Sequence, residues 1–373
     1  MISVFSYHAI YILLAVITII AAYSKSDVVF INTSENKVAI INIILVVITI
    51  STIAALRPFE SADTANYFSV YISAKEPALY FKDFLIYGKR IHGIETSFVF
   101  LFSVLKSLSF SFRQVLFIIA FVNSALILTI AIKISQLLSK KPDISKIVAL
   151  FVSYFGLHYC CIAIRAGLSL GIGMLAVYLL LTRRRAIGIV ALYGSILVHS
   201  MSVLFIPIII YLCFNNSANY EQCEDSQLPL ITIMICFLSL TFNLGSKIVD
   251  AFIHLFEFMS DYFGINSFAG YMVGLDRAVG VKDWFIAIAI GLTMLSVTQS
   301  TRLVKKSVVI VLLGLVITSF LYPVRAINRA ADYCFLMCLP LIGTFISKEY
   351  FPKGKVFAEY IIYPMLLAVQ FNL

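Results

Sequence analysis

Long apolar runs follow one another along the chain, and they constrain its fold more than any other feature. A helix that crosses a bilayer needs about 20 apolar residues, with about 17 as a practical minimum. Runs that reach or approach this length lie at 5–23, 38–56, 94–110, 114–132, 147–163, 166–182, 186–213, 228–245, 283–299, 307–322, 333–347 and 356–371. In addition, 61% of the residues are apolar and only 13% are charged, against about 45–50% and about 25% in soluble domains. A soluble protein is therefore excluded.

The runs predict an all-α, polytopic integral membrane protein with about 11–13 transmembrane or re-entrant helices. The number varies because several runs are short and because 186–213 is either one long helix or two short ones. The small residues Gly167, Gly171 and Gly173 predict a helix face that packs closely on a neighbour. No internal repeat interrupts the pattern, so we expect a single transmembrane domain over residues 1–373.

Basic residues predict the orientation, because Lys and Arg accumulate in cytoplasmic loops. The basic loops carry Lys133, Lys140, Lys141 and Lys146; Arg183, Arg184 and Arg185; Arg302, Lys305 and Lys306; and Lys348, Lys353 and Lys355. Placing these in the cytoplasm makes 57–93 and 246–282 extracytoplasmic loops, and it turns the chain near residues 164, 199 and 323–332 outward.

One part of this orientation is inconsistent. The runs 94–110 and 114–132 separate the outer loop 57–93 from the basic loop 133–146, and two passes would return the chain to the outer side. Either one of these runs is re-entrant, or 66–88 enters the membrane, or one orientation is wrong.

Charge, cysteines and motifs exclude several classes of function. The net charge of +9 is explained by the cytoplasmic loops, so no nucleic-acid partner is expected. The seven cysteines lie mostly inside apolar runs without a C-x-x-C pair, which is typical of packing residues. The sequence contains no Walker A loop, G-x-S-x-G, H-E-x-x-H or Asp-x-Asp motif. We therefore expect no metal and no cofactor.

Ionisable residues outside the cytoplasmic loops are the informative ones, because such groups are costly near a bilayer. They form four groups: Arg57, Asp63 and Tyr67; Glu95; Arg165 and His199; and Arg325, Arg329 and Asp332. Simpler interpretations exist, since Arg57 could snorkel to the interface and Glu95 could favour a helix dipole. Arg325 and Arg329, however, lie four residues apart, which places both on one helix face. Two such guanidinium groups suit a phosphorylated ligand.

In this order and spacing, these residues resemble the EpsG family of multi-pass bacterial proteins, which is related to the Wzy-type polymerases. The resemblance rests on Arg57 followed by Asp63-Thr64 and Tyr67, on Glu95 at the head of a helix, on Arg165 before a small-residue helix, on His199-x-x-Ser202, and on Arg325 and Arg329. It implies a glycosyltransferase of the bacterial inner (cytoplasmic) membrane with a periplasmic active site. Such an enzyme joins undecaprenyl-diphosphate-linked repeat units into O-antigen, capsule or exopolysaccharide.

The resemblance also implies partners and residue roles. The partners are the lipid-linked glycan donor and acceptor, membrane lipid and a chain-length regulator. The roles, as hypotheses, are these: His199 or Asp63 as the catalytic base; Arg165, Arg325 and Arg329 as diphosphate ligands; and Arg57, Tyr67, Glu95 and Asp332 as residues that orient the substrate.

Two other functions remain open at this point. A flippase or transporter for lipid-linked saccharides would also need many helices and cationic residues, although its charges should follow a path through the midplane. A ligase that transfers a finished glycan to lipid A or protein would share the outward site.

Overall fold

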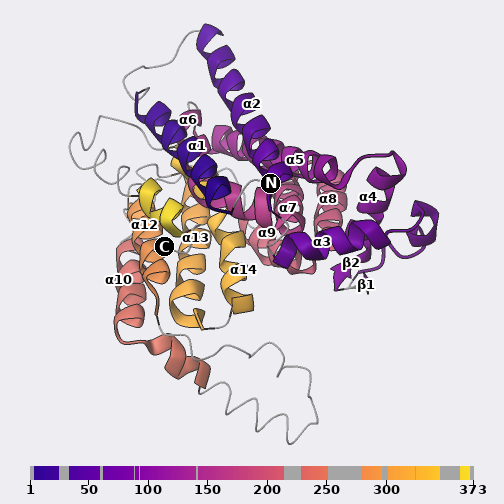
Figure 1. Ribbon diagram of the computed structural model, residues 1–373. Coiled ribbons are helices and arrows are strands. Elements are labelled where there is room, and N and C mark those ends of the chain that lie inside the picture. Colours follow the sequence, from indigo (N-terminus) through magenta and orange to yellow (C-terminus); the bar gives the residue numbers. More distant parts are fainter. Residues whose placement is uncertain are drawn as a thin grey trace, which may run out of the picture. The chain divides into compact units, whose positions relative to one another are not determined.

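The computed structural model describes residues 4–24, 33–58, 62–87, 89–91, 93–139, 142–213, 228–250, 279–295, 301–323, 325–344 and 362–369. The chain divides into two compact units, Met1–Asn215 and Asn216–Leu373. Figure 1 shows the first in indigo to magenta and the second in orange to yellow. Each unit is described by itself.

The first unit is helical apart from one short hairpin in its described residues. Its elements are α1 (Val4–Ser24), α2 (Thr33–Leu56), α3 (Ala62–Ser73), η1 (Pro77–Tyr80), β1 (Arg90–Ile91), β2 (Ile94–Glu95), α4 (Thr96–Ser107), α5 (Phe112–Leu138), α6 (Ile144–Leu150), η2 (Phe151–Ile162), α7 (Ile164–Leu181), α8 (Arg185–Val198), η3 (Ser200–Leu204) and α9 (Phe205–Cys213). The central helices α2, α5, η2 and α7 pack on one another, and α8 packs on α7.

The second unit is also helical where it is described. Its elements are α10 (Leu228–Thr241), a helix at Leu244–Asp250, α12 (Val281–Leu295), α13 (Arg302–Leu321), α14 (Arg325–Phe335), α15 (Cys338–Ile342) and a helical segment at 362–369. The long helix α13 contacts α10, α12, α14 and α15, and Ser239 Oγ on α10 donates to Ser319 O on α13 at 2.9 Å.

The predicted all-α, polytopic membrane class is confirmed. Among the described residues, four helices are long and apolar enough to cross a membrane: Phe112–Leu138, Ile144–Ile162, Ile164–Leu181 and Arg302–Leu321. The pair Pro229–Thr241 and Leu244–Asp250, bent by 74°, would be a fifth. Shorter apolar helices cover His8–Ile20, Ile40–Leu56, Thr96–Ser107, Arg185–Val198, Ser200–Cys213 and Ala330–Ile342.

Several of the predicted passes are shortened because the chain changes direction inside the apolar run. The run 186–213 is two helices, since His199 adopts an extended backbone between α8 and η3. Near residue 243 the chain turns through Asn243, whose φ of 52° lies in the left-handed region. Apolar composition alone does not report such breaks, because both halves remain equally hydrophobic.

The predicted close-packing face of α7 is confirmed. A Cβ atom at Gly167 would collide with the carbonyl oxygen of Tyr159, and one at Gly173 would collide with the ring of Phe205. Glycine at these positions therefore allows η2 and α9 to approach the backbone of α7.

The short helix α4 favours one of the alternatives for the inconsistent orientation, the one in which the run 94–110 does not cross the membrane. Its 12 residues span only about 18 Å, less than a bilayer core of about 30 Å. Near its start, Thr96 Oγ1 donates to Lys89 O at 3.0 Å. Near its end, Lys106 Nζ donates to Ile72 O at 2.6 Å. Both ends of α4 thus contact the segment 62–89, and the orientation of the loops stays a prediction.

Candidate active site

A small hairpin positions the carboxylate at the centre of the site. Gly93, with a φ of 76°, permits the tight turn between β1 and β2, and the strands pair Arg90 with Glu95. Glu95 is also the residue before α4. The Ser97 hydroxyl donates to the carbonyl of Leu197, which ties the start of α4 to the end of α8. Glu95 is therefore held between the hairpin and the terminus of another helix.

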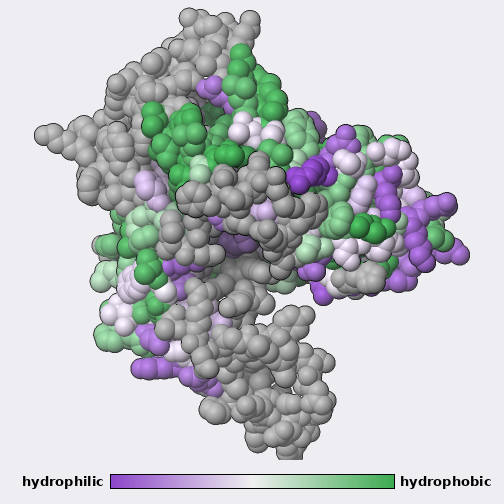
Figure 2. Space-filling model, in the orientation of Figure 1, coloured by the Kyte–Doolittle hydropathy of each residue, from purple (hydrophilic) through white to green (hydrophobic). Residues whose placement is uncertain are grey.

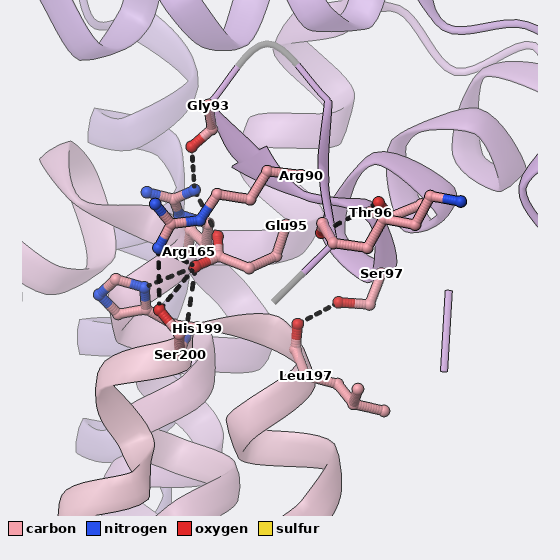
Figure 3. Close-up of polar contacts among 10 residues, drawn as sticks. Arg90, Gly93, Glu95, Thr96, Ser97, Arg165, Leu197, His199 and Ser200 are labelled. Carbon is pink, nitrogen blue, oxygen red and sulfur yellow. Dashed lines mark hydrogen bonds and ion pairs between the residues drawn. The ribbon is translucent and has the colours of Figure 1, made fainter. Parts of the chain in front are cut away.

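The Glu95 carboxylate collects partners from three separate parts of the first unit (Figure 3). Arg165 Nη1 lies 2.5 Å from Oε2. On Oε1, Arg90 Nη2 lies at 3.5 Å, His199 Nδ1 at 3.4 Å, and Ser200 donates from its backbone N at 3.3 Å and from Oγ at 3.2 Å. Arg90 Nη2 also donates to Ser200 Oγ at 3.0 Å. We call these five residues the Glu95 cluster.

Exposure differs sharply across the Glu95 cluster. The Glu95 side chain is 3% exposed, whereas the side chains of Arg165 and His199 are 20% and 17% exposed and that of Arg90 is 46% exposed. The buried Glu95 carboxylate thus binds side chains that are themselves partly exposed at the surface. Because two guanidinium groups face one carboxylate, the cluster keeps a surplus of positive charge.

Arg165 is placed by the break between η2 and α7. The helix that begins at Ile144 widens into the π-helical segment η2 and ends at Ala163, whose φ of −88° and ψ of 55° are not helical. Such π-helical segments are rare and concentrate at functional sites. Arg57, 3% exposed, donates from Nη1 to the carbonyls of Cys161 and Ile162. Its guanidinium therefore satisfies backbone acceptors that the helix end leaves open.

Asn123 of α5 holds the other side of the same break. The fully buried side chain donates from Nδ2 to Ile164 O at 2.9 Å and to Tyr159 O at 3.4 Å. One amide thus joins the last turn of η2 to the first residue of α7. Since Arg165 follows Ile164 directly, the Asn123 amide helps to fix the backbone from which the Arg165 side chain extends.

We expect Asn123→Leu to lower the free energy of unfolding by about 1–3 kcal/mol, because it leaves buried carbonyls without a donor. Activity should fall as well, since the backbone at Arg165 is no longer held in place by the Asn123 amide. Thermal unfolding in detergent micelles measures the first effect. Ser135→Ala is the matched control on α5, because the buried Ser135 hydroxyl has no hydrogen-bond partner within the described residues. Equal stability of the two variants would contradict this role for Asn123.

Tyr67 connects Arg57 to the Glu95 cluster. The Arg57 guanidinium carbon lies 5.6 Å from the centre of the Tyr67 ring, and the ring is buried. Burial raises the pKa of the Tyr67 hydroxyl, which also feels the charges of Arg165, Asp63 and Arg57. Asp63 itself lies exposed in the first turn of α3. Tyr67 thus lies within electrostatic range of three charged residues that the sequence singles out.

Glu95 is ionised at any physiological pH. Burial alone would raise the pKa of its carboxyl, but the hydrogen bond from His199 and the positive charge of Arg165 outweigh burial and lower the pKa to about 2. A carboxylate only accepts hydrogen bonds, so the proton of a neutral His199 ring lies on Nδ1. Nε2 is then left as the acceptor, which is the arrangement that a general base requires.

The sequence model of one family matches residues 40–372, nearly the whole chain. The chain belongs to the EpsG family. With its long apolar helices, membership in the EpsG family identifies a membrane protein of the polysaccharide-polymerase type. No curated protein and no solved structure matches the chain significantly.

Eight of the residues on which the EpsG resemblance rests lie in the first unit, and the structure links six of them. Glu95 directly contacts both Arg165 and His199. The Arg57 guanidinium lies over the Tyr67 ring, and the charges of Arg165 and Asp63 act on the Tyr67 hydroxyl. Within the described residues, no three His, Cys, Asp or Glu side chains lie where they could hold a metal ion.

The late residues Arg325, Arg329 and Asp332 all belong to α14 in the second unit. Their spacing places the two arginines on one face of this helix. The side chains of residues 324–329 lie outside the described part of the chain. A shared diphosphate site with Arg165 therefore stays a prediction.

Sequence reasoning missed Arg90 and the amide of Asn123. The sequence around Arg90 predicts a hairpin, because Ile91 and Ile94 flank a two-residue turn that ends in glycine. In such a hairpin, Arg90 and Glu95 form the next cross-strand pair and carry opposite charges. Asn123 is an amide within an otherwise apolar span, which indicates a buried hydrogen bond. Its partners could not be read from sequence, since they are backbone carbonyls at a helix break.

Proposed function

We propose that this chain is a membrane glycosyltransferase that polymerises oligosaccharide repeat units carried on undecaprenyl diphosphate. The proposal rests on one observation above all: a buried, ionised Glu95 holds Arg165, Arg90 and His199 together at one end of a helical membrane unit. Membership in the EpsG family supports the same reaction class. The product would be O-antigen, capsule or exopolysaccharide.

The arginines would stabilise the leaving group. When the bond from the anomeric carbon to the diphosphate breaks, negative charge builds up on the diphosphate oxygens. Preplaced cations stabilise such charge most effectively in a site that excludes water. Arg165 and Arg90 both keep part of the side chain exposed while Glu95 binds the guanidinium group. A guanidinium group can pair with two phosphate oxygens at once. In this proposal Arg325 and Arg329 supply further phosphate contacts.

His199 is the better candidate for the catalytic base. Its Nδ1 faces the Glu95 carboxylate, so Nε2 can accept the proton of the acceptor hydroxyl while the hydroxyl oxygen attacks the anomeric carbon. The electron pair of the broken bond leaves with the lipid diphosphate. Asp63, the other candidate, lies exposed on α3. Asp63, Arg57, Tyr67 and Asp332 would then orient sugars or neighbouring side chains.

In this proposal the site faces the periplasm from the inner membrane, and the donor and acceptor are both lipid-linked glycans. The positive-inside distribution of the basic loops supports this orientation. In the first unit, the turn at Arg183 and Arg184 lies at the far end of α7 from Arg165, about 27 Å away along the helix. This separation is the one expected for opposite faces of a bilayer. A chain-length regulator would be a separate partner.

A purified protein assay tests the function. The protein in vesicles, given a synthetic undecaprenyl-diphosphate-linked repeat unit, should yield a ladder of products that differ by one repeat. His199→Gln should reduce the rate by about 10²–10⁴-fold, as expected for loss of a general base. Movement of the unit across the bilayer without elongation would indicate a flippase. Transfer of a finished glycan to another acceptor would indicate a ligase, and either result would reject the proposal.

A further inference from the structure

A surface segment that the proposed chemistry does not use runs from Pro77 to Tyr87, between α3 and the hairpin. It begins with the short helix η1 and continues as turns. Several contacts hold it in place. The buried Tyr80 hydroxyl accepts a hydrogen bond from Lys75 N at 3.1 Å, and the ring of Phe84 stacks on that of Phe100 with centroids 4.6 Å apart. The segment is therefore anchored and has an inner and an outer face.

The outer face is strongly apolar. Its exposed side chains are Leu79 (63%), Phe81 (66%), Leu85 (53%), Ile86 (51%) and Tyr87 (55%). Large exposed apolar side chains that lie so close together in the chain are typical of a contact surface rather than of ordinary solvated surface. In Figure 2, hydrophobic and strongly hydrophilic residues alternate at the right of the view, in the region of α3, α4 and the hairpin.

This apolar face continues onto a lipid-facing side of α8. The Tyr193 hydroxyl on α8 donates to Leu85 O at 2.6 Å. Around it, α8 exposes Ile189 (60%) and Val190 (71%), side chains that in a membrane protein of this type meet acyl chains. Tyr193 lies five residues before the end of α8, which is about 7.5 Å along the axis. The segment is thus fixed beside the last turns of a helix whose exposed side chains are apolar.

Basic residues lie within and beside the same segment. Lys75 and Lys82 are exposed, and Lys89, 45% exposed, pairs with Asp83 at 2.6 Å. Lysines beside aromatic and aliphatic side chains are typical of segments that lie in a membrane interface, because the lysines meet anionic headgroups while the apolar groups enter the acyl boundary.

We infer that the segment Pro77–Tyr87 lies in the interfacial layer of the bilayer, on the leaflet of the Glu95 cluster, with Leu79 and Phe81 inserted among lipids. The occupant of this apolar face is lipid, because the face continues the lipid-facing side of α8 and carries lysines at its border. The inference holds whatever reaction the Glu95 cluster performs.

Tryptophan fluorescence tests this position. The chain has a single tryptophan, so Trp284→Phe gives a silent background into which Phe81→Trp is introduced. The full-length protein is reconstituted in vesicles of phosphatidylethanolamine and phosphatidylglycerol that carry nitroxide labels either near the headgroup or deep in the acyl chain. We expect the shallow label to reduce emission by about two-fold or more and the deep label to act less, as for an interfacial side chain.

Two variants keep the result interpretable. Val190→Trp is the lipid-facing reference on α8 and should be quenched more by the deep label. Leu79→Trp repeats the measurement at a second position in case Phe81→Trp fails to fold. Quenching by aqueous iodide without quenching by lipid labels would place the segment in water and overturn the inference. Protection from both quenchers would mean that protein covers the face, which would also overturn it.

Discussion

Replacing Arg165 with alanine should abolish long polysaccharide and leave single repeat units on the lipid carrier, in a protein that still folds. Arg165 binds Glu95 directly and keeps a fifth of its side chain exposed, so it is the cation best placed to meet a departing diphosphate. Loss of one preorganised contact to transition-state charge costs about 10²–10³-fold in rate. The repeat-unit assay measures the rate, and a polysaccharide gel from expressing cells measures chain length.

A conservative change separates charge from geometry. Arg165→Lys should recover only part of the activity, because an ammonium group cannot form the two parallel hydrogen bonds of a guanidinium. Arg184→Ala is the matched control, since this exposed arginine lies at the opposite end of α7. Normal ladder length in Arg165→Ala at normal expression would reject the role of Arg165 in diphosphate binding.

Glu95→Gln should reduce polymerisation by about 10²-fold or more while conserving the shape of the side chain. The amide cannot neutralise Arg165 and Arg90, which then repel each other, and it no longer fixes the proton of His199 on Nδ1. Misplacing catalytic groups by about 1 Å commonly costs this much. Glu76→Gln is the control, because Glu76 is an exposed glutamate of the first unit. Unchanged activity in Glu95→Gln would show that the carboxylate does not organise the site.

The same substitution should change how stability depends on pH. The pKa of Glu95 is lowered from about 4.5 to about 2 in the folded protein, so the ionised carboxylate favours the folded state. This contribution is present above pH 4.5 and is lost as pH falls toward 2. Over that range, the temperature of thermal unfolding should therefore fall further for the wild type than for Glu95→Gln. Parallel curves for the two proteins would contradict the lowered pKa.

The helices of this chain could be predicted from hydrophobicity, because lipid requires long apolar segments and little else. The predicted run 166–182, for example, matches α7 closely. The basic loops also predict turns near residues 164 and 199, and the helices do break at Ala163 and His199. The break near Asn243, inside the predicted run 228–245, was not predicted. Ala163 and His199 interrupt apolar stretches without a proline or glycine at the break itself, and side chains from distant helices stabilise the open backbone instead. Such compensation depends on tertiary contacts that no local pattern encodes.

The candidate site was predictable in part for a related reason. Charged residues near a membrane are few, so Arg57, Glu95, Arg165 and His199 stand out in the sequence, and their proximity in the first unit agrees with that reasoning. Arg90 did not stand out, because it lies in a loop where charges are common. Its relevance comes from the hairpin register that sets it opposite Glu95, which depends on a turn of only two residues.

The bonds from Arg57 and Asn123 to the end of η2 and the start of α7 bear on biosynthesis. Arg57 and Asn123 are both translated before the carbonyl groups that they bind. In the nascent chain, these hydrogen bonds can form only after the later residues have emerged. Until residue 164 has left the ribosome, neither donor has its final partner.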